Sequence, residues 1–385
     1  MRIGISGIDG VGKSQQIKLL QFYNGGTLCF TRPLIEYSSR WPKLKSHEMF
    51  DWWFKKVGID EFLEIVLESL NMRHSETEKS VAILDRGTLM FKAVCAATMS
   101  VRSGAELRDS IKKVDSCFAQ KLGYRLEDEH NILLLPNTEY QESISPYLAL
   151  LRKDSEYFTQ EENEFYLKYQ KLLREAVALY FRDDAIGRLT VDCSICEMQN
   201  RLRLLINKIT KQSLPEICTG VKRVVGFGGL SECGKSSFAE HLYKRRGYYR
   251  LKLGYFVEVL KRHGRKDTPE NVAMEFLHFC KVHYYVENFT LESLHEPYTP
   301  AFLKLLFGQK FKIAYLDAPF NVRSKRASID EGISLDNAEA ITRSKDQVKQ
   351  SRGAEIVDKI ADINFDNSED KHHENMLKFE VMVAS

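Results

Sequence analysis

The chain has 385 residues, of which 43% are hydrophobic and 28% are charged, and its formal net charge is +3. This length exceeds one ordinary domain and fits two domains of roughly 190 to 220 residues each. No apolar run approaches the about 18 residues of a membrane span, and the small net charge does not indicate a nucleic-acid surface. We therefore expect a cytoplasmic protein with neither a membrane nor a nucleic acid as partner.

The first half of the chain alternates strand-like and helix-like segments. In chain order these are strand 2–6, helix 13–23, strand 27–31, helical region 45–74, strand 81–85, helices to about 122, strand 132–135, strand 189–192 and helix 197–209. Strands that alternate with helices predict a parallel sheet covered on both faces.

A glycine-rich loop directly follows the first strand. Residues 7–14 read Gly-Ile-Asp-Gly-Val-Gly-Lys-Ser and match the pattern G-x-x-x-x-G-K-S. Gly10 and Gly12 allow backbone N–H groups to surround a polyphosphate, the Lys13 ammonium reaches its β and γ phosphates, and Ser14 supplies a magnesium ligand. The loop predicts a site for ATP with Mg²⁺, and the alternative is a glycine-rich turn that meets the pattern by accident.

Charged residues follow the later strands of this half. Asp85 and Arg86 end the third strand, in the crevice where open α/β sheets bind ligands, although a surface salt bridge is the alternative. Arg32 is predicted to clamp an acceptor phosphate, with a solvated loop arginine as the alternative. A kinase also needs a cationic lid that excludes water, for which Arg152 is the candidate. Arg73 is expected on a helix surface, with a position facing the acceptor as the alternative.

These motifs resemble those of thymidylate kinases. The resemblance is carried by the loop at 7–14, by Phe30-Thr31-Arg32-Pro33, by Leu84-Asp85-Arg86-Gly87 and by the tyrosine-rich run at 165–169. It implies that Asp9 contacts the sugar hydroxyl of the acceptor nucleotide. It also implies that Asp85 and Arg86 serve magnesium and phosphate positioning, and that the lid arginine lies near Arg152.

The alternation lapses over residues 211–220 and then resumes. We predict a first domain at 1–212, a linker at 213–222 and a second domain at 223–385. The elements expected in the second are strand 223–228, helix 236–246, strand 249–253, helices to about 286, strand 289–294, helix to 306, strand 311–317 and strand 361–365. The predicted fold class is α/β, with two tandem P-loop NTPase domains, each a parallel sheet with helices on both faces.

A second loop with the same pattern opens the second domain. Residues 229–236 read Gly-Leu-Ser-Glu-Cys-Gly-Lys-Ser, and its lysine follows the first by 222 residues (235 − 13). By the same physical argument the residues predicted to bind ATP and Mg²⁺ are Gly229, Gly234, Lys235, Ser236 as the metal ligand, and the adjacent Ser237.

The second domain resembles dephospho-coenzyme A kinases and related nucleoside-monophosphate kinases, in residues 224–229 and in the C-terminal run 359–367. The resemblance implies a lid helix carrying Arg323 and Arg326. It also implies that Asp362 and Asn367 flank the adenine. Glu292 is expected either to contact magnesium-bound water or to be an ordinary acid at a strand end.

The leading interpretation is an enzyme with two fused nucleotide-kinase-like domains. The first would transfer the γ-phosphoryl of ATP to a nucleoside monophosphate, dTMP or a related nucleotide, with Lys13, Arg86 and Arg152 as catalytic residues. The second would act on an unnamed small acceptor through Lys235, Arg323 and Arg326. The alternatives are a nucleotide-dependent switch without an acceptor, or one domain that has become structural and supports a homodimer.

Overall fold

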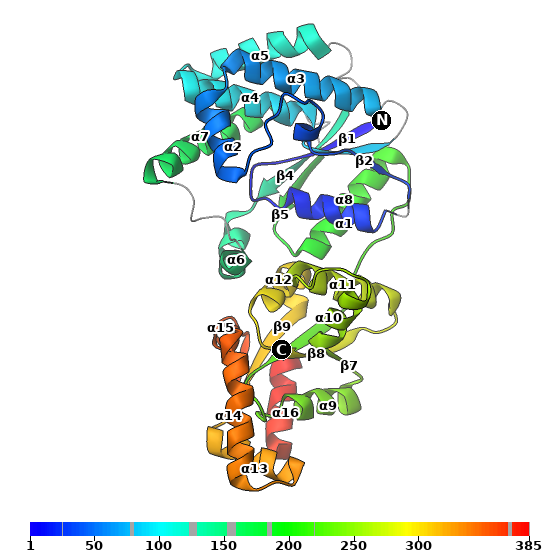
Figure 1. The fold of residues 1–385 in the computed structure, drawn as a ribbon. Helices are drawn as coiled ribbons and strands as arrows, with labels where there is room; N and C mark the ends of the chain where they lie inside the picture. The colour runs from blue at the N-terminus through cyan, green and yellow to red at the C-terminus, as the bar shows by residue number, and fades with distance from the viewer. Residues whose placement is uncertain are drawn as a thin grey trace. The chain divides into compact units, whose positions relative to one another are not determined.

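The computed structural model describes residues 1–24, 26–77, 81–122, 129–151, 159–182, 187–218, 220–368 and 372–384 (Figure 1). Contacts divide the chain into two compact units, each with its own sheet. The first comprises Met1–Gln141, Lys153–Asp192 and Met198–Pro215, and the second Glu142–Arg152, Cys193–Glu197 and Glu216–Ser385. The predicted domain limits stay a prediction, and the main division between the units, at Pro215–Glu216, lies within the predicted linker.

The first unit contains a five-stranded sheet in the order β2-β3-β1-β4-β5, in which all neighbouring strands are parallel. The strands are β1 (Arg2–Ser6), β2 (Cys29–Phe30), β3 (Ala82–Asp85), β4 (Glu129–Pro136) and β5 (Gly187–Val191). The central strand β1 is buried along its whole length. Burial at every position, without alternation, is what a sheet covered on both faces requires.

Helices cover both faces of this sheet, as the sequence predicts. In Figure 1, α3, α4, α5 and α7 lie on one face, and α1 and α8 lie on the other. The helical segments of this unit are α1 (Lys13–Phe22), η1 (Leu34–Glu36), α2 (Ser46–Asp51), η2 (Trp52–Lys56), α3 (Ile59–Glu76), α4 (Thr88–Ser103), α5 (Leu107–Leu122), α7 (Gln160–Tyr180) and most of α8 (Ile195–Thr210). Most of α6 (Thr138–Leu151) belongs to the second unit.

The helical region predicted over 45–74 is not continuous. After α2 the chain widens into the π-helical turn η2, in which the Val57 N–H donates to the Trp52 carbonyl at 2.9 Å. Val57 and Gly58 are then extended, so α3 starts afresh at Ile59. Such wide turns are rare and occur often at functional sites. Here the turn carries the adjacent aromatic residues Trp53 and Phe54.

The second unit contains a second parallel sheet, in the order β10-β9-β6-β8-β7. Its strands are β6 (Arg223–Gly228), β7 (Tyr249–Lys252), β8 (Asn288–Leu294), β9 (Phe311–Asp317) and β10 (Ile363–Asp366). Numbered by their place within the unit, these strands have the same order as those of the first sheet. The two predicted α/β folds are thereby confirmed, and both share one topology.

The helices of the second unit again flank the sheet. They are α9 (Lys235–Arg246), α10 (Leu253–Arg262), α11 (Pro269–Val282), α12 (Tyr298–Phe307), η4 (Gly308–Lys310), α13 (Phe320–Glu331), α14 (Leu335–Ser351), α15 (Ala354–Lys359) and α16 (His372–Ala384). The last of them, α16, is absent from the sequence predictions. Its Phe379 is fully buried and lies 5.5 Å from Phe227 and 4.8 Å from Phe238 between ring centroids. The helix therefore completes the core of this unit.

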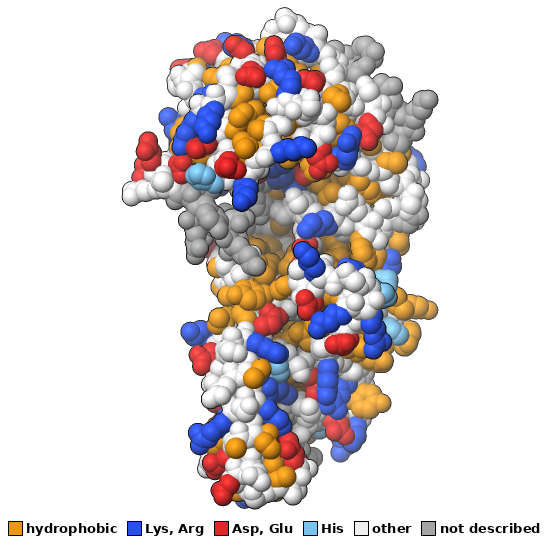
Figure 2. Space-filling model, in the orientation of Figure 1, with side chains coloured by type: hydrophobic (Ala, Val, Ile, Leu, Met, Phe, Trp, Pro, Cys, Tyr) orange, Lys and Arg blue, Asp and Glu red, His pale blue; other side chains and the backbone are white. Residues whose placement is uncertain are grey.

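Charges of both signs are interspersed over the face of the chain drawn in Figure 2. Among the described residues, none of the helices has the length and apolar character that crossing a membrane requires.

Candidate functional site

Both glycine-rich loops connect the central strand of a sheet to the helix that follows it. Gly12 and Gly234 precede α1 and α9 with φ of 88° and 100°, in the left-handed region that glycine adopts readily. A Cβ on Gly7 would lie 2.7 Å from the Leu134 carbonyl oxygen, and one on Gly229 would lie 2.3 Å from that of Leu316. The two loops thus use glycine at equivalent positions, for the same reasons.

Each loop lysine folds back onto its own loop. Lys13 Nζ donates to the Ile8 carbonyl at 2.7 Å, and Lys235 Nζ donates to the Gly229 carbonyl at 2.9 Å. Burial, with the nearby Arg86, lowers the pKa of Lys13 to about 8. The predicted ligands Ser14, Ser236 and Ser237 lie exposed in the first turns of α1 and α9. No described side chain caps either helix, so the N–H groups of the first turns face the loops.

A carboxylate lies beside each loop at the same sheet register. Ile5 pairs with Asp85, and Phe227 pairs with Glu292. Ile5 and Phe227 each lie two residues before the first glycine of their own loop. Ser236 Oγ donates to Glu292 Oε2 at 2.7 Å. Burial opposes ionisation of Glu292, but the hydrogen bonds from Arg250 and Ser236 bring its pKa below the usual value. Oδ1 of Asp85 is buried without a hydrogen-bond partner among the described residues.

The residue after each carboxylate has a left-handed backbone although it is not glycine. The φ of Arg86 is 64°, and that of Ser293 is 76°. Such a conformation costs of order 1–3 kcal/mol and persists where the surroundings hold it. The Arg86 N–H donates to the Ile5 carbonyl at 3.1 Å, and Arg73 Nη1 donates to the Arg86 carbonyl at 3.0 Å. Arg73 is fully buried, so its predicted surface position is wrong.

Asp9, within the first loop, joins three donors. It accepts from Arg86 Nη2 at 3.0 Å, from the Tyr166 hydroxyl at 3.0 Å and from Gln170 Nε2 at 3.1 Å. Burial alone would raise the pKa of Asp9, but Arg86, Lys13 and these hydrogen bonds lower it below its usual value. Asp9 is therefore ionised at neutral pH.

Helix α7 supplies two of those donors, which the sequence analysis did not assign. The helix starts at a capping box in which Thr159 Oγ1 accepts from the Glu162 N–H at 3.2 Å and the Thr159 N–H donates to Glu162 at 2.9 Å. Tyr166 and Gln170 are four residues apart and lie on one face of the helix. From that spacing the sequence could have predicted that the two side chains share a helix face. It could not have predicted that this face contacts Asp9.

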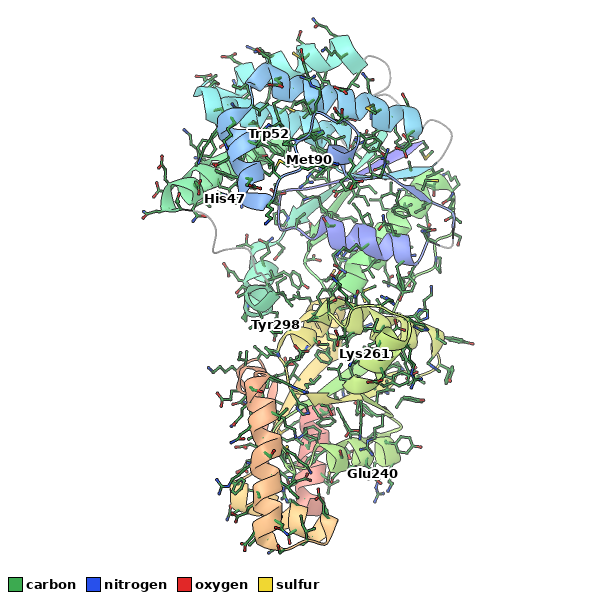
Figure 3. The ribbon with its side chains drawn as sticks, viewed as in Figure 1. His47, Trp52, Met90, Glu240, Lys261 and Tyr298 are labelled. Atoms are coloured by element: carbon green, nitrogen blue, oxygen red, sulfur yellow. The ribbon has the colours of Figure 1, made fainter. Side chains whose placement is uncertain are left out.

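A cavity of about 340 Å³ lies next to these charged groups, within the first unit. Its charged lining residues are Asp9, Asp85 and Arg86. The rest of its lining is apolar or aromatic and comprises Pro33, Leu34, Ile35, Trp41, Trp53, Phe54, Met90, Phe91, Val94, Tyr166, Tyr169 and Leu173. Met90 projects from α4, and Trp52 from the turn that carries Trp53 (Figure 3). The volume and lining are typical of a small-molecule site.

Of the two further cations predicted for this site, Arg32 lies elsewhere and Arg152 is not among the described residues. The Arg32 side chain is 55% exposed, pairs with Glu76 at 3.4 Å and lies over the Tyr37 ring at 4.6 Å. It does not line the cavity. Arg152 lies outside the described residues, so its role as a lid stays a prediction.

In the second unit, Arg323 connects helices α13 and α14 to the loop through hydrogen bonds. It is buried, forms an ion pair with Asp346 at 2.5 Å and donates to the Ser231 carbonyl at 3.1 Å. Asp346 in turn accepts from the Ser231 N–H at 2.8 Å. Arg326 donates to the carbonyl of Asn367 at 2.8 Å. Both predicted lid arginines thus bind protein carbonyls in this structure.

A lysine that the sequence analysis did not assign also reaches this loop. Lys349 Nζ, from α14, donates to Ser231 Oγ at 2.7 Å. Burial and the nearby Lys235 lower the pKa of Lys349 to about 8. His295 lies near the same cations. Burial, together with the charges of Lys349, Lys235 and Arg352, lowers its pKa to about 3. Cations therefore gather at the second loop, where an anion would stabilise them.

The two residues expected beside an adenine have protein partners. Asp362 pairs with Lys304 at 2.5 Å and accepts from the Ile313 N–H at 2.8 Å. Asn367 Nδ2 donates to the Cys233 carbonyl, within the second loop, at 3.0 Å.

No protein-family model matches the sequence, and no curated protein is significantly similar to it in sequence. Over about half of its length the chain is similar in structure to nucleotide and shikimate kinases. At these levels of identity the similarity concerns the fold alone. The structures include thymidylate kinase from Candida albicans (14% identity, 55% of this chain and 92% of that chain, TM-score 0.35), deoxyadenosine kinase from M. mycoides with bound dCTP (19%, 55% and 100%, 0.34), and shikimate kinase from Acinetobacter baumannii with shikimate (14%, 43% and 93%, 0.28).

Proposed function

We propose that the chain is an ATP-dependent phosphotransferase whose first unit transfers the γ-phosphoryl group to a nucleoside or nucleotide in the cavity. One observation carries the proposal, namely that Asp9 belongs both to the phosphate-binding loop and to the lining of the cavity. A phosphate donor on the loop and an acceptor in the cavity would therefore meet at Asp9, Asp85 and Arg86.

The residues present fit a magnesium ion beside each loop. Oxygen donors are the ligands that Mg²⁺ prefers, and Asp85 has a buried oxygen without a described partner. Ser14 and Asp85 would hold the ion in the first unit, and Ser236 with Glu292 would do so in the second. When bound, Mg²⁺ neutralises charge on the β and γ phosphates.

The transfer itself needs mainly positioning and charge stabilisation. An oxygen of the acceptor forms the bond to the γ phosphorus while the bond from that phosphorus to the bridging oxygen of ADP breaks. The proton of an acceptor hydroxyl passes to Asp9, the carboxylate of the cavity lining that is not proposed as a magnesium ligand. Lys13 and Arg86 stabilise the negative charge spread over the transferred group.

A direct assay tests the proposal. The full chain is mixed with ATP, Mg²⁺ and a panel of nucleosides and nucleoside monophosphates that includes dTMP, and ADP is measured with and without each acceptor. We expect ADP formation that depends on an acceptor. ADP formed equally fast without any acceptor would instead support a nucleotide-dependent switch and refute the phosphotransferase.

We propose a second kinase-like site in the second unit, for an acceptor that remains to be identified. It is supported by the shared topology, the equivalent glycines and the contact between Ser236 and Glu292.

Nucleotide binding at this second site is expected to weaken as the pH rises through about 8, the pKa of Lys349. Below that pH the Lys349 side chain is a protonated ammonium and attracts phosphate. Above it the neutral amine must take up a proton before it can do so, which lowers the affinity. The affinity for Mg-ATP, measured in a Lys13→Ala background about one pH unit either side of this value, should differ several-fold. The groups that face Lys349 are Ser231, Glu232, Cys233, Lys235, His295 and Asp346, and Arg352 faces His295.

Lys349→Arg is the matched variant for this test, because arginine stays charged over this range. It should remove the pH step while keeping the affinity measured at the lower pH. A step that persists unchanged in Lys349→Arg would assign the titration to another group.

A further inference from the structure

The charged residues that line the cavity of the first unit indicate the charge of the acceptor that it binds. Among the described lining residues, the charged groups are two carboxylates and one guanidinium, so the lining has a net charge of −1 when all three are ionised. The guanidinium of Arg86 is already paired with Asp9 at 3.0 Å. Oδ1 of the second carboxylate, Asp85, has no hydrogen-bond partner among the described residues, although Lys13 and Arg73 lie close enough to interact with it electrostatically.

The other nearby cations of the described part of the first unit do not line the cavity. Arg32 pairs with Glu76 and is not part of the lining. Arg73 donates to the Arg86 carbonyl, and Lys13 donates to its own loop and lies 4.0 Å from Asp9. A clamp of two or more cations, of the kind that holds a phosphate dianion, is therefore absent from the described lining.

The remainder of the cavity is suited to a flat ring. Six aromatic side chains line it, and they contact one another: Trp41 and Trp53 have ring centroids 6.2 Å apart, and Phe54 and Tyr169 5.0 Å apart. Aromatic walls favour stacking or edge contacts with a planar ligand. The hydroxyl of Tyr166, on one wall, is bound to Asp9 at 3.0 Å, so rings and carboxylates belong to one site.

We propose that the acceptor of the first unit is an uncharged nucleoside, whose base lies among the aromatic side chains and whose hydroxyl faces Asp9 and Asp85. This rests on the proposed phosphotransferase function and replaces the monophosphate that the sequence predicts. A monophosphate would bring nearly two negative charges next to Asp9 and Asp85. Arg86 is the one cation of the described lining, and the Lys13 ammonium, 4.0 Å from Asp9, would be engaged by the phosphates of ATP, so this repulsion disfavours binding. A neutral hydroxyl can donate a hydrogen bond to either carboxylate.

Tryptophan fluorescence can test this without any turnover. The chain has three tryptophans; Trp41 and Trp53 line the cavity, and Trp52 lies 5.5 Å from Trp41. The full-length protein is titrated, without ATP, with thymidine, deoxyadenosine, deoxycytidine and deoxyguanosine, and with the 5′-monophosphate of each. We expect at least one nucleoside to change the fluorescence and to bind about tenfold or more tightly than its own monophosphate.

The proposal is overturned if the monophosphates bind more tightly, or if none of the nucleosides changes the fluorescence at millimolar concentration. These outcomes are distinct from a failure of the proposed function. A nucleoside that binds, in a protein that forms no acceptor-dependent ADP, would refute the phosphotransferase and leave the assigned binding site standing.

Two variants sharpen the test. Asp9→Asn removes one negative charge and releases Arg86, so the preference for nucleoside over monophosphate should fall several-fold. Arg32→Ala should leave both affinities unchanged, because Arg32 lies outside the lining. Selective loss of monophosphate binding in Arg32→Ala would restore the predicted phosphate clamp and overturn the proposal. Thermal unfolding of each variant checks that it is folded, and the wild-type titration decides the question by itself.

Discussion

Replacing Lys13 with alanine is expected to lower acceptor-dependent ADP formation by about 1,000-fold or more, which corresponds to about 4 kcal/mol of activation free energy. The lysine lies at the start of α1, beside the glycine-rich loop that shares a residue, Asp9, with the described cavity. Its ammonium donates to the Ile8 carbonyl in this structure and would exchange that contact for phosphate oxygens. Alanine leaves the developing charge on the transferred group without this cation.

The same substitution at an exposed lysine of the same helix is the control. Lys18 is exposed on α1, and Lys18→Ala should retain nearly full activity. Lys235→Ala separates the contributions of the two loops, since activity on a nucleoside should survive it. A folded Lys13→Ala protein that keeps a tenth or more of the activity would contradict catalysis at the first loop.

The bounds of strands that depend on local sequence alone were predicted closely. β1, β6 and β9 have the predicted bounds, because each is a short, mainly apolar segment that ends next to a turn or a glycine-rich loop. The loops follow from the sequence for the same reason, since glycines and a lysine at fixed spacing leave few alternatives. In contrast, α16 was missed although Met376, Phe379 and Val383 have helical spacing.

The placement of charged side chains could not be predicted, because it depends on contacts between distant segments. Arg32 and Arg73 are both arginines near a predicted site, yet one pairs with Glu76 at the surface and the other is fully buried. The equivalence of Asp85 and Glu292 was also hidden. They follow their loop lysines by 72 residues (85 − 13) and 57 residues (292 − 235), so only the strand register relates them.

Replacing Asp346 with alanine is expected to destabilise the second unit by about 3–5 kcal/mol, the usual effect of breaking a buried ion pair by removing one partner. Arg323 would be left as an uncompensated charge in a buried position. The Ser231 N–H would also lose its acceptor, so the second loop should become less ordered. Urea unfolding followed by circular dichroism measures the change, and Mg-ATP affinity in a Lys13→Ala background measures the effect on the loop.

Two further variants test whether the loss of stability comes from the unpaired buried charge or would follow any substitution in α14. Asp336→Ala removes an exposed carboxylate from the same helix and should change the unfolding free energy by less than about 1 kcal/mol. The double substitution Arg323→Met with Asp346→Leu removes both charges and should recover most of the stability, because apolar residues of similar volume replace buried ion pairs well. It should not recover Mg-ATP affinity, since neither new side chain can bind the backbone of Ser231. Recovery of both properties would show that the pair has no part in shaping the second loop.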